Sequence, residues 1–168
     1  NFRDYDTLMF LLKMIKENVK MFTPRNLSST LSHISKLNYI NVHEETFFLE
    51  VVHNILGQCK EKAQDFDLRS ISSVLTALSK MNISDKDTIT ALCSTLNDNV
   101  HEANPRVFSN TMLALSKLKF EDEVVLGSLS KVVQTKISLC KSQDLSTTLY
   151  ALSNLQYKDD ALLICIFD

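Results

Sequence analysis

The chain has 168 residues, of which 45% are hydrophobic and 23% are charged, and its formal net charge is −2. This balance excludes an intrinsically disordered chain. The small negative charge excludes nucleic-acid binding through an overall basic character, so any such site must be a local patch. Only two glycines and two prolines occur, which is too few for a β-protein rich in tight turns and predicts an all-α fold.

The first predicted element is a helix over residues 4–22, with acids in its first turn and lysines further on, an order that suits the helix dipole. We interpret it as the second helix of a repeat whose first helix is absent. Pro24 then begins the next helix, where its missing N–H has no helical partner to lose. We expect this helix to run to about Lys36 and a turn to begin at Asn38-Tyr39.

The helix after Pro24 is the first of four similar segments. These are Pro24–Tyr39, Leu68–Ile83, Pro105–Phe120 and Asp144–Tyr157. The apolar residue before their second shared serine is Ile34, Leu78, Leu115 and Leu152 in turn, so the segments recur after 44, 37 and 37 residues. A fixed period of this length is the signature of a stacked-repeat protein, in which no unit can bury its apolar face alone.

A second helix is expected after each segment, and each begins with acidic residues. These acids are Glu44 and Glu45, Asp85 and Asp87, Glu121 to Glu123, and Asp159 and Asp160. We attribute the longer first interval to Lys60–Asp65, as a longer second helix or loop. The apolar end of the last helix, Ala161–Phe167, lacks a partner and should be covered by a further repeat or another protein.

The sequence therefore predicts one right-handed α-solenoid of stacked helix-turn-helix repeats of about 37 residues. Its units are residues 1–22 (a second helix alone), 24–64, 65–103, 104–141 and 142–168 (a truncated repeat). A compact helical bundle is the alternative, but it gives no reason for near-identical helices at a fixed period.

The first helix of each unit has an apolar side, a side of serines and a polar side. The apolar side is the predicted core: Leu27, Leu31, Ile34; Ile71, Leu75, Leu78; Phe108, Met112, Leu115; and Leu145, Leu149, Leu152. The serines are Ser28, Ser72, Ser109 and Ser146 and, seven residues on, Ser35, Ser79, Ser116 and Ser153. We interpret the serines as a smooth strip for a neighbouring helix; a row of hydroxyls for a ligand is the alternative.

The polar side carries a cation near each end of the first helices. Arg25, Arg69 and Arg106 stand at its start, followed by Gln143 in the last unit, and Lys36, Lys80 and Lys117 stand eleven residues on, followed by Asn154. Short polar side chains lie between these cations, at Ser29, Ser73, Asn110 and Thr147, and Asn26, Ser70, Val107 and Asp144 stand beside the arginines. Stacking would place the arginines in one column and the lysines in another.

Two cationic columns around a polar column suit a single strand of RNA, with phosphates on the cations and bases against the variable residues. The predicted RNA-binding residues are Arg25, Asn26, Ser29, Lys36, Arg69, Ser70, Ser73, Lys80, Arg106, Asn110, Lys117, Asp144 and Thr147. The alternative is that these side chains are simply a solvated helix surface.

The units have the form P-R-x-[LF]-S-[SN]-T-[LM]-x-A-L-S-K-L-x-[FY], and the phrase [LM]-x-A-L-S-[KN]-L occurs at Met112–Leu118 and Leu149–Leu155. They resemble the helical repeats of RAP-domain and FAST-kinase-like proteins, also called heptatricopeptide or octotricopeptide repeats. The resemblance implies a mitochondrial or other organellar protein that binds single-stranded or ribosomal RNA through its first helices. It also implies a role in RNA processing, stability or translation, in some members on mitochondrial ribosomes. The RAP region of that family is not visible in this sequence, so no nuclease activity is carried over.

No catalytic, cofactor or metal pattern is found. The histidines do not have the spacing of a zinc-binding helix, and no Gly-rich phosphate loop or G-x-S-x-G turn occurs. Four cysteines without a C-x-x-C pair favour reduced thiols, and no apolar run is long enough for a membrane span. We expect a non-enzyme without cofactor, metal or membrane partner. The alternative function is a protein-scaffold α-solenoid, such as a component of a mitochondrial ribosome-like assembly.

Overall fold

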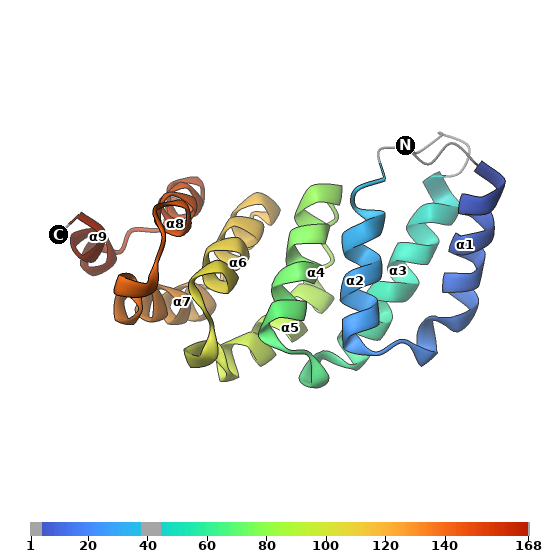
Figure 1. Cartoon of the computed structure of the whole chain (residues 1–168), viewed down its shortest axis with the longest axis horizontal. Coiled ribbons are helices and arrows are strands. Elements are labelled where there is room, and N and C mark those ends of the chain that lie inside the picture. Colours follow the sequence, from blue (N-terminus) through green and yellow to red (C-terminus); the bar gives the residue numbers. More distant parts are fainter. Residues whose placement is uncertain (1–4, 38–44, 168) are drawn as a thin grey trace.

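Four helices of similar sequence, the first helices of the predicted repeats, lie side by side in one layer (Figure 1). The computed structural model describes residues 5–37 and 45–167. The first layer consists of α2 (Pro24–Ile34), α4 (Leu68–Met81), α6 (Pro105–Leu118) and α8 (Ser142–Leu155). The second layer consists of α1 (Tyr5–Asn18), α3 (Glu45–Glu61), α5 (Lys86–Asp98), α7 (Glu123–Thr135) and α9 (Asp160–Phe167). Short 3-10 helices follow α1, α3, α5 and α7, namely η1 (Val19–Met21), η2 (Ala63–Asp65), η3 (Val100–Glu102) and η4 (Ile137–Leu139).

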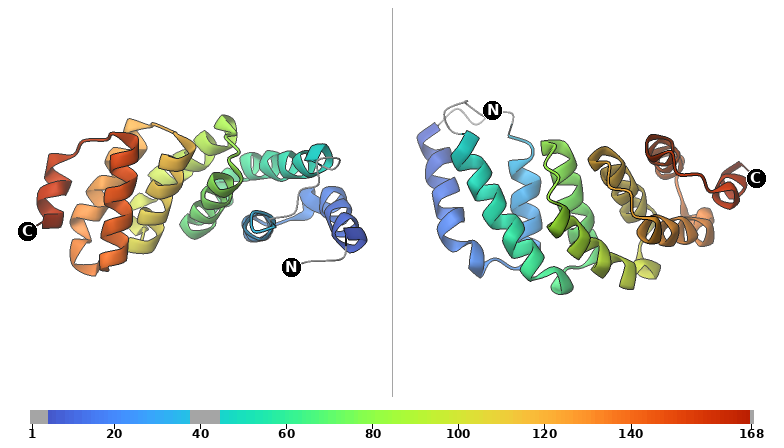
Figure 2. Two further views of the ribbon diagram at one scale, coloured as in Figure 1. Left: turned by 90° about the horizontal axis from the view of Figure 1, so that it is seen from above. Right: turned by 180° about the vertical axis from the view of Figure 1, so that it is seen from behind.

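Each helix packs against its neighbours in the stack. Contacts in the first layer join α2 to α4, α4 to α6 and α6 to α8, and in the second layer α1 to α3, α3 to α5, α5 to α7 and α7 to α9. The first layer faces the viewer in Figure 1, and the second layer faces the viewer in the right-hand view of Figure 2. No strand occurs in the part of the chain that the structure describes. The predicted all-α helical-repeat fold is therefore confirmed, and the helices do not gather into a bundle.

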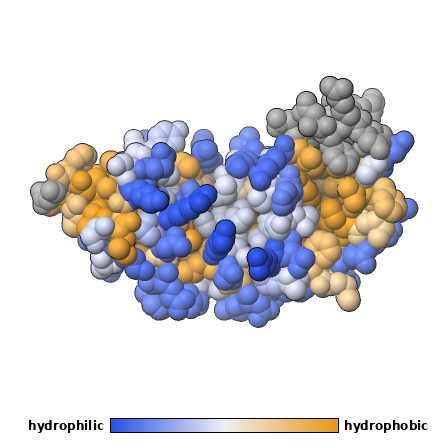
Figure 3. All heavy atoms as spheres, viewed as in Figure 1, coloured by the Kyte–Doolittle hydropathy of each residue, from blue (hydrophilic) through white to orange (hydrophobic). Residues whose placement is uncertain are grey.

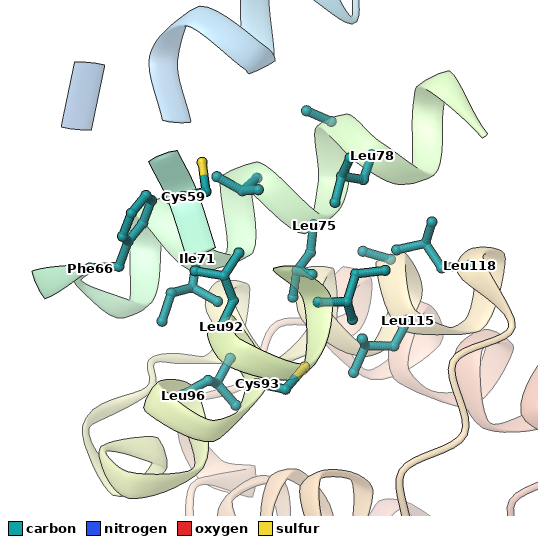
Figure 4. Close-up of a cluster of buried hydrophobic side chains, with 14 of the residues drawn as sticks. Cys59, Phe66, Ile71, Leu75, Leu78, Leu92, Cys93, Leu96, Leu115 and Leu118 are labelled. Atoms are coloured by element: carbon teal, nitrogen blue, oxygen red, sulfur yellow. The ribbon is translucent and has the colours of Figure 1, made fainter. Parts of the chain in front are cut away.

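The core lies between the two layers, where the predicted apolar side of the first helices meets the second helices. The nine predicted core residues of α2, α4 and α6 are at most 4% exposed. Figure 4 shows Ile71, Leu75 and Leu78 of α4 and Leu92 and Leu96 of α5 within one cluster of buried side chains. In α8, Leu152 is buried, whereas Leu145 and Leu149 are only half-buried. The core thus thins at the C-terminal end of the stack.

The extra residues of the first, 44-residue repeat do not lie where the sequence predicted them. α3 begins 21 residues after the start of α2, against 18 for the next pairs of helices, and α3 has 17 residues where α5 and α7 have 13. A longer second helix is therefore right, but the assignment to Lys60–Asp65 is wrong, because the same turn and 3-10 helix recur in every repeat as η3 and η4.

The ends of two predicted helices also differ from expectation. α2 ends at Ile34, because Lys36 and Leu37 bond to carbonyls only three residues back, which tightens the last turn. The first predicted helix is split into α1 and η1 for the same reason. The predicted turn at Asn38-Tyr39 and the predicted helix start at Glu44 lie outside the described residues.

At two junctions between repeats a lysine side chain joins one repeat to the one before it, a contact that the sequence does not predict. The Nζ of Lys62 donates to the carbonyl oxygens of Lys20 and Phe22, at 2.8 Å each. Two repeats further along the chain, the Nζ of Lys136 donates to the carbonyl oxygens of His101 and Ala103, at 2.7 and 2.8 Å. Each lysine thus binds the carbonyls at the end of the preceding 3-10 helix, an arrangement we term the lysine clamp. A clamp of this kind fixes the offset between neighbouring repeats.

The lysine clamp predicts a specific loss of stability. Lys62→Met or Lys136→Met should lower the free energy of unfolding by about 1 kcal/mol each, because the carbonyls lose charge-assisted hydrogen bonds while the aliphatic stem remains. Urea denaturation followed by circular dichroism measures this loss. Lys131→Met, at an exposed position of α7, is the matched control and should change little. Equal effects of all three substitutions would contradict the clamp.

The turn between the two helices of a repeat has the same backbone geometry three times. The residues that follow α4, α6 and α8 are Asn82, Lys119 and Gln156, with φ angles of 54°, 52° and 51°. Asparagine tolerates this left-handed conformation, whereas lysine and glutamine carry a Cβ penalty of about 1 kcal/mol. The fold thus accepts local strain to direct each second helix back across the first.

Glycine at these turns should stabilise the protein. Lys119→Gly and Gln156→Gly are expected to raise the free energy of unfolding by about 0.5 to 1 kcal/mol each, and Asn82→Gly to raise it less. Lys117→Gly, inside the last turn of α6, should instead lower it by about 1 kcal/mol. Denaturation midpoints that fall for the turn variants as they do for Lys117→Gly would show that the left-handed geometry is not maintained in solution.

Candidate nucleic-acid interface

The charges of the two layers are segregated. The helices α2, α4 and α6 contain no acidic residue, and their cations Arg25, Arg69, Lys80, Arg106 and Lys117 are all exposed. Every helix of the second layer contains at least one acid. We term the exposed side of α2, α4, α6 and α8 the A-face. Hydrophilic side chains cover the middle of this face, and apolar ones lie at its two ends (Figure 3). The net charge of −2 therefore conceals a cationic surface.

The arginines line two successive grooves of the A-face. Arg25 and Arg69 line a groove of about 400 Å³ between α2 and α4. Arg69 and Arg106 line the next groove, of about 420 Å³, together with Lys80. The structure thus places the three arginines on the same side of successive helices. Within residues 5–37 and 45–167 none of them makes an ion pair; the pairs are Lys16–Glu50, Lys60–Asp87, His101–Glu102 and Lys158–Asp160.

One carboxylate belongs to these grooves. Asp67 precedes α4 and lines the first groove, where its Oδ1 accepts the backbone N–H of Ser70 at 2.6 Å. Its position at the helix N-terminus is a cap, which satisfies a donor that the helix leaves free. The guanidinium groups of Arg25 and Arg69 therefore remain available to an anion.

The predicted lysines are exposed, but they do not share one groove. Lys80 lines the second groove with the arginines, whereas Lys117 lines a third groove of about 480 Å³ at the other end of α6 and α8, together with Lys119 and Asn154. Lys36 is exposed just after α2 and lines none of the three grooves. The lysines thus border the cationic surface more loosely than the arginines do.

The predicted polar column is present over three helices. Ser29 and Ser73 line the first groove, and Ser73 and Asn110 line the second. Thr147 of α8 lines neither of these grooves, and its hydroxyl accepts a hydrogen bond from the side-chain amide of Gln143 at 3.2 Å. Because α8 also carries Asp144 and has no cation within its span, the continuous cationic surface ends at α6.

Three of the predicted RNA-binding residues take part in helix capping. The amide oxygen of Asn26 accepts from the hydroxyl of Thr23, the cap of α2. Ser70 is buried, and its N–H binds the cap of α4. The carboxylate of Asp144 accepts the N–H of Lys141, the residue that precedes α8, at 3.0 Å. Thr23 and Asp67, three residues before Asn26 and Ser70, were sequence signals for such caps, whereas Lys141 before Asp144 gave none.

The burial and hydrogen bonds of the serines support the packing interpretation of the serine strip. Ser28, Ser72 and Ser109 are buried. Ser28 and Ser109 donate to carbonyls of their own helices, and Ser72 donates to the carbonyl of Val107 in the next helix at 3.5 Å. Ser146 and Ser153 of α8 are exposed, because no further first helix covers them in the structure. A ligand is not required to explain the strip.

An exposed aromatic residue of the A-face was missed as a site residue. Tyr150 of α8 is 56% exposed. The equivalent residues one, two and three repeats earlier are Leu113, Thr76 and Ser32. All three remain half-exposed, although neighbouring first helices pack beside them. This position therefore belongs to the A-face in every repeat.

The remaining surface offers apolar ends and little chemistry. An apolar groove of about 290 Å³ between α1 and α2 is lined by Leu8, Leu11 and Ile15, and Ile164 and Phe167 are exposed on α9. Burial raises the pKa of the Cys59 and Cys93 thiols to about 12, which makes them poor nucleophiles. The described residues contain no group of three or more potential metal-binding side chains, and no described helix has the length and apolarity to cross a membrane.

Comparison with known proteins gives one family. The model of the family described as RNA-editing substrate-binding complex 6 protein matches residues 2–160. This match covers all four first helices and therefore the whole cationic part of the A-face. No curated protein matches the chain. The resemblance to RAP-domain and FAST-kinase-like repeats stays a prediction.

Proposed function

The chain belongs to the family of RNA-editing substrate-binding complex 6 proteins, and from this premise we propose that it holds single-stranded RNA along the A-face as a non-catalytic component of an RNA-editing complex. The name of the family describes an assembly that binds the RNA substrates of editing. A subunit of such an assembly needs a surface for RNA and surfaces for protein partners. The A-face and the apolar ends of the stack are suited to these two purposes.

The observation that carries the proposal is the segregation of charge. Five cations on α2, α4 and α6, without an acid in those helices, form a positive surface on a chain whose net charge is negative. RNA phosphates bind such a surface through Coulomb attraction and the release of counterions. Neighbouring helices of a stack lie about 8–10 Å apart, so a flexible single strand can adjust its phosphates to the arginines more easily than a rigid duplex can.

The finer parts of the proposal concern place and partners. We propose that the protein acts in an organelle, the mitochondrion in the first instance, in RNA processing, stability or translation. A relationship to RAP-domain and FAST-kinase-like repeats fits the same role. The protein partners would cover apolar side chains at the ends of the stack, such as Phe10 and Met14 of α1 and Ile164 and Phe167 of α9, which are exposed by between 42% and 76%.

Those exposed apolar ends also support a second candidate function, that of a protein scaffold without RNA contact, as in a ribosome-like assembly with ribosomal partners. In that case the cations of the A-face would be a solvated surface or would bind acidic proteins. The two functions differ in whether isolated RNA binds to the chain.

Charge reversal on the A-face tests the proposal. Arg25→Glu, Arg69→Glu and Arg106→Glu together should weaken binding of single-stranded RNA by about tenfold or more, because three cation–phosphate contacts become repulsive. The measurement is fluorescence anisotropy with labelled RNA at fixed salt. Helicity and melting temperature should be unchanged, since all three side chains are exposed.

The matched control is the triple variant Lys13→Glu, Lys86→Glu and Lys131→Glu. It changes the net charge by the same amount, at exposed positions of α1, α5 and α7 in the second layer. It should weaken RNA binding much less. If both triple variants lose affinity equally, the effect is one of net charge and the A-face has no special role. If the unaltered chain binds no RNA, the scaffold function is favoured.

A further inference from the structure

We propose that the A-face binds the sugar–phosphate backbone of RNA and does not select bases. This inference rests on the proposed function and specifies which part of the RNA the site recognises. It departs from the expectation that a repeat protein reads about one base per repeat, which requires side chains that reach base edges and differ in their hydrogen-bonding pattern.

The first argument is the uniformity of the residues between the cations. Ser29, Ser73 and Asn110 are the polar residues of this column that line the two arginine grooves. A serine hydroxyl and an asparagine amide each both donate and accept hydrogen bonds. The hydroxyls of Ser29 and Ser73 can therefore bond an edge of any of the four bases and offer little discrimination, and Asn110 alone in this column has an amide that can bond one base bidentately. The same groups also suit a ribose 2′-hydroxyl, which donates and accepts as well.

The residues that stand beside the arginines, which are the other candidates for reading bases, are buried or engaged in capping. Asn26 and Asp144 use their side-chain oxygens in helix capping. The equivalent residues of the two middle repeats, Ser70 and Val107, are 6% and 8% exposed. A code of two side chains per base would need this second position to be free in every repeat, whereas it is buried in the two middle repeats and one side-chain oxygen is engaged in capping in the other two.

The grooves in which the bases would lie also hold few aromatic side chains. Among the described residues that line the two arginine grooves there is no Phe, Tyr or Trp, and the single aromatic ring is the imidazole of His33 in the first groove, whose Nδ1 lies 2.6 Å from the carbonyl oxygen of Ser29. Proteins that read single-stranded bases usually hold them by stacking on such rings before they test the base edges. Tyr150 lies on α8, beyond the last arginine, and stacking on its ring would accept every base. What the grooves do supply is guanidinium, ammonium and hydroxyl groups, which match phosphate and ribose.

The experiment compares RNAs of equal length and different sequence with the full chain. Labelled oligo(U), oligo(C) and mixed-sequence RNA are titrated at one salt concentration; oligo(A) is omitted because it stacks on itself. The dissociation constants should agree within about threefold, because one discriminating base contact changes affinity by about tenfold or more. The logarithm of the binding constant should fall with the logarithm of salt with the same slope for each RNA, about −3.5 if all five cations of the A-face bind phosphates.

Two substitutions supply an independent measurement. Ser73→Ala and Asn110→Ala remove side chains of the polar column without changing the charge. Each should weaken binding less than about threefold, and equally for all three RNAs, since no single base contact is lost. A larger preference for one sequence, or a loss that depends on the base present, would overturn the inference while leaving the proposed function intact. No binding of any of the RNAs would instead remove the proposed function and this inference together.

Discussion

The close approach of neighbouring first helices is the constraint on which the rest of the structure depends. Small residues make it possible: Ser28, Ser72 and Ser109 are buried on one side of these helices, and Ala77 and Ala114 are 1% exposed in the same layer. With such residues in contact, helix backbones can approach closely and in a constant register. Residues at equivalent positions of the repeats must then stand next to one another, and the arginines, one per repeat, share adjacent grooves.

This constraint explains how a chain with a net charge of −2 presents a cationic surface. The first helices meet each other through serine and alanine and meet the second layer through leucine, so that only one side of each remains for polar residues. That side carries cations in α2, α4 and α6, while the acids lie in the second layer and near the starts of helices. The lysine clamp acts at the edge of the stack where the first helices begin, and at two junctions it ties one repeat to the 3-10 helix of the repeat before it.

The period of the sequence predicted the fold well, because the same pattern of apolar and polar residues occurs in four helices that pack in the same way. The core side, from Leu27 to Leu152, and the column of arginines followed from helical spacing alone. Features that depend on three-dimensional contacts between repeats could not be predicted in this way. The lysine clamp joins side chain and backbone some 40 residues apart, and a lone lysine near the end of a helix gives no signal for such a bond. The candidate site was predicted less well than the fold, since Asn26, Ser70 and Asp144 were interpreted as surface residues from their polarity, whereas capping requires polar residues at the same places.

The central claim is that RNA lies across the first layer, and ultraviolet crosslinking followed by mass spectrometry of the RNA-bound chain tests it most directly. The account predicts crosslinked peptides from α2, α4 and α6, with few from α3, α5 and α7. Crosslinks concentrated in the second layer, or confined to the apolar ends of the stack, would contradict it.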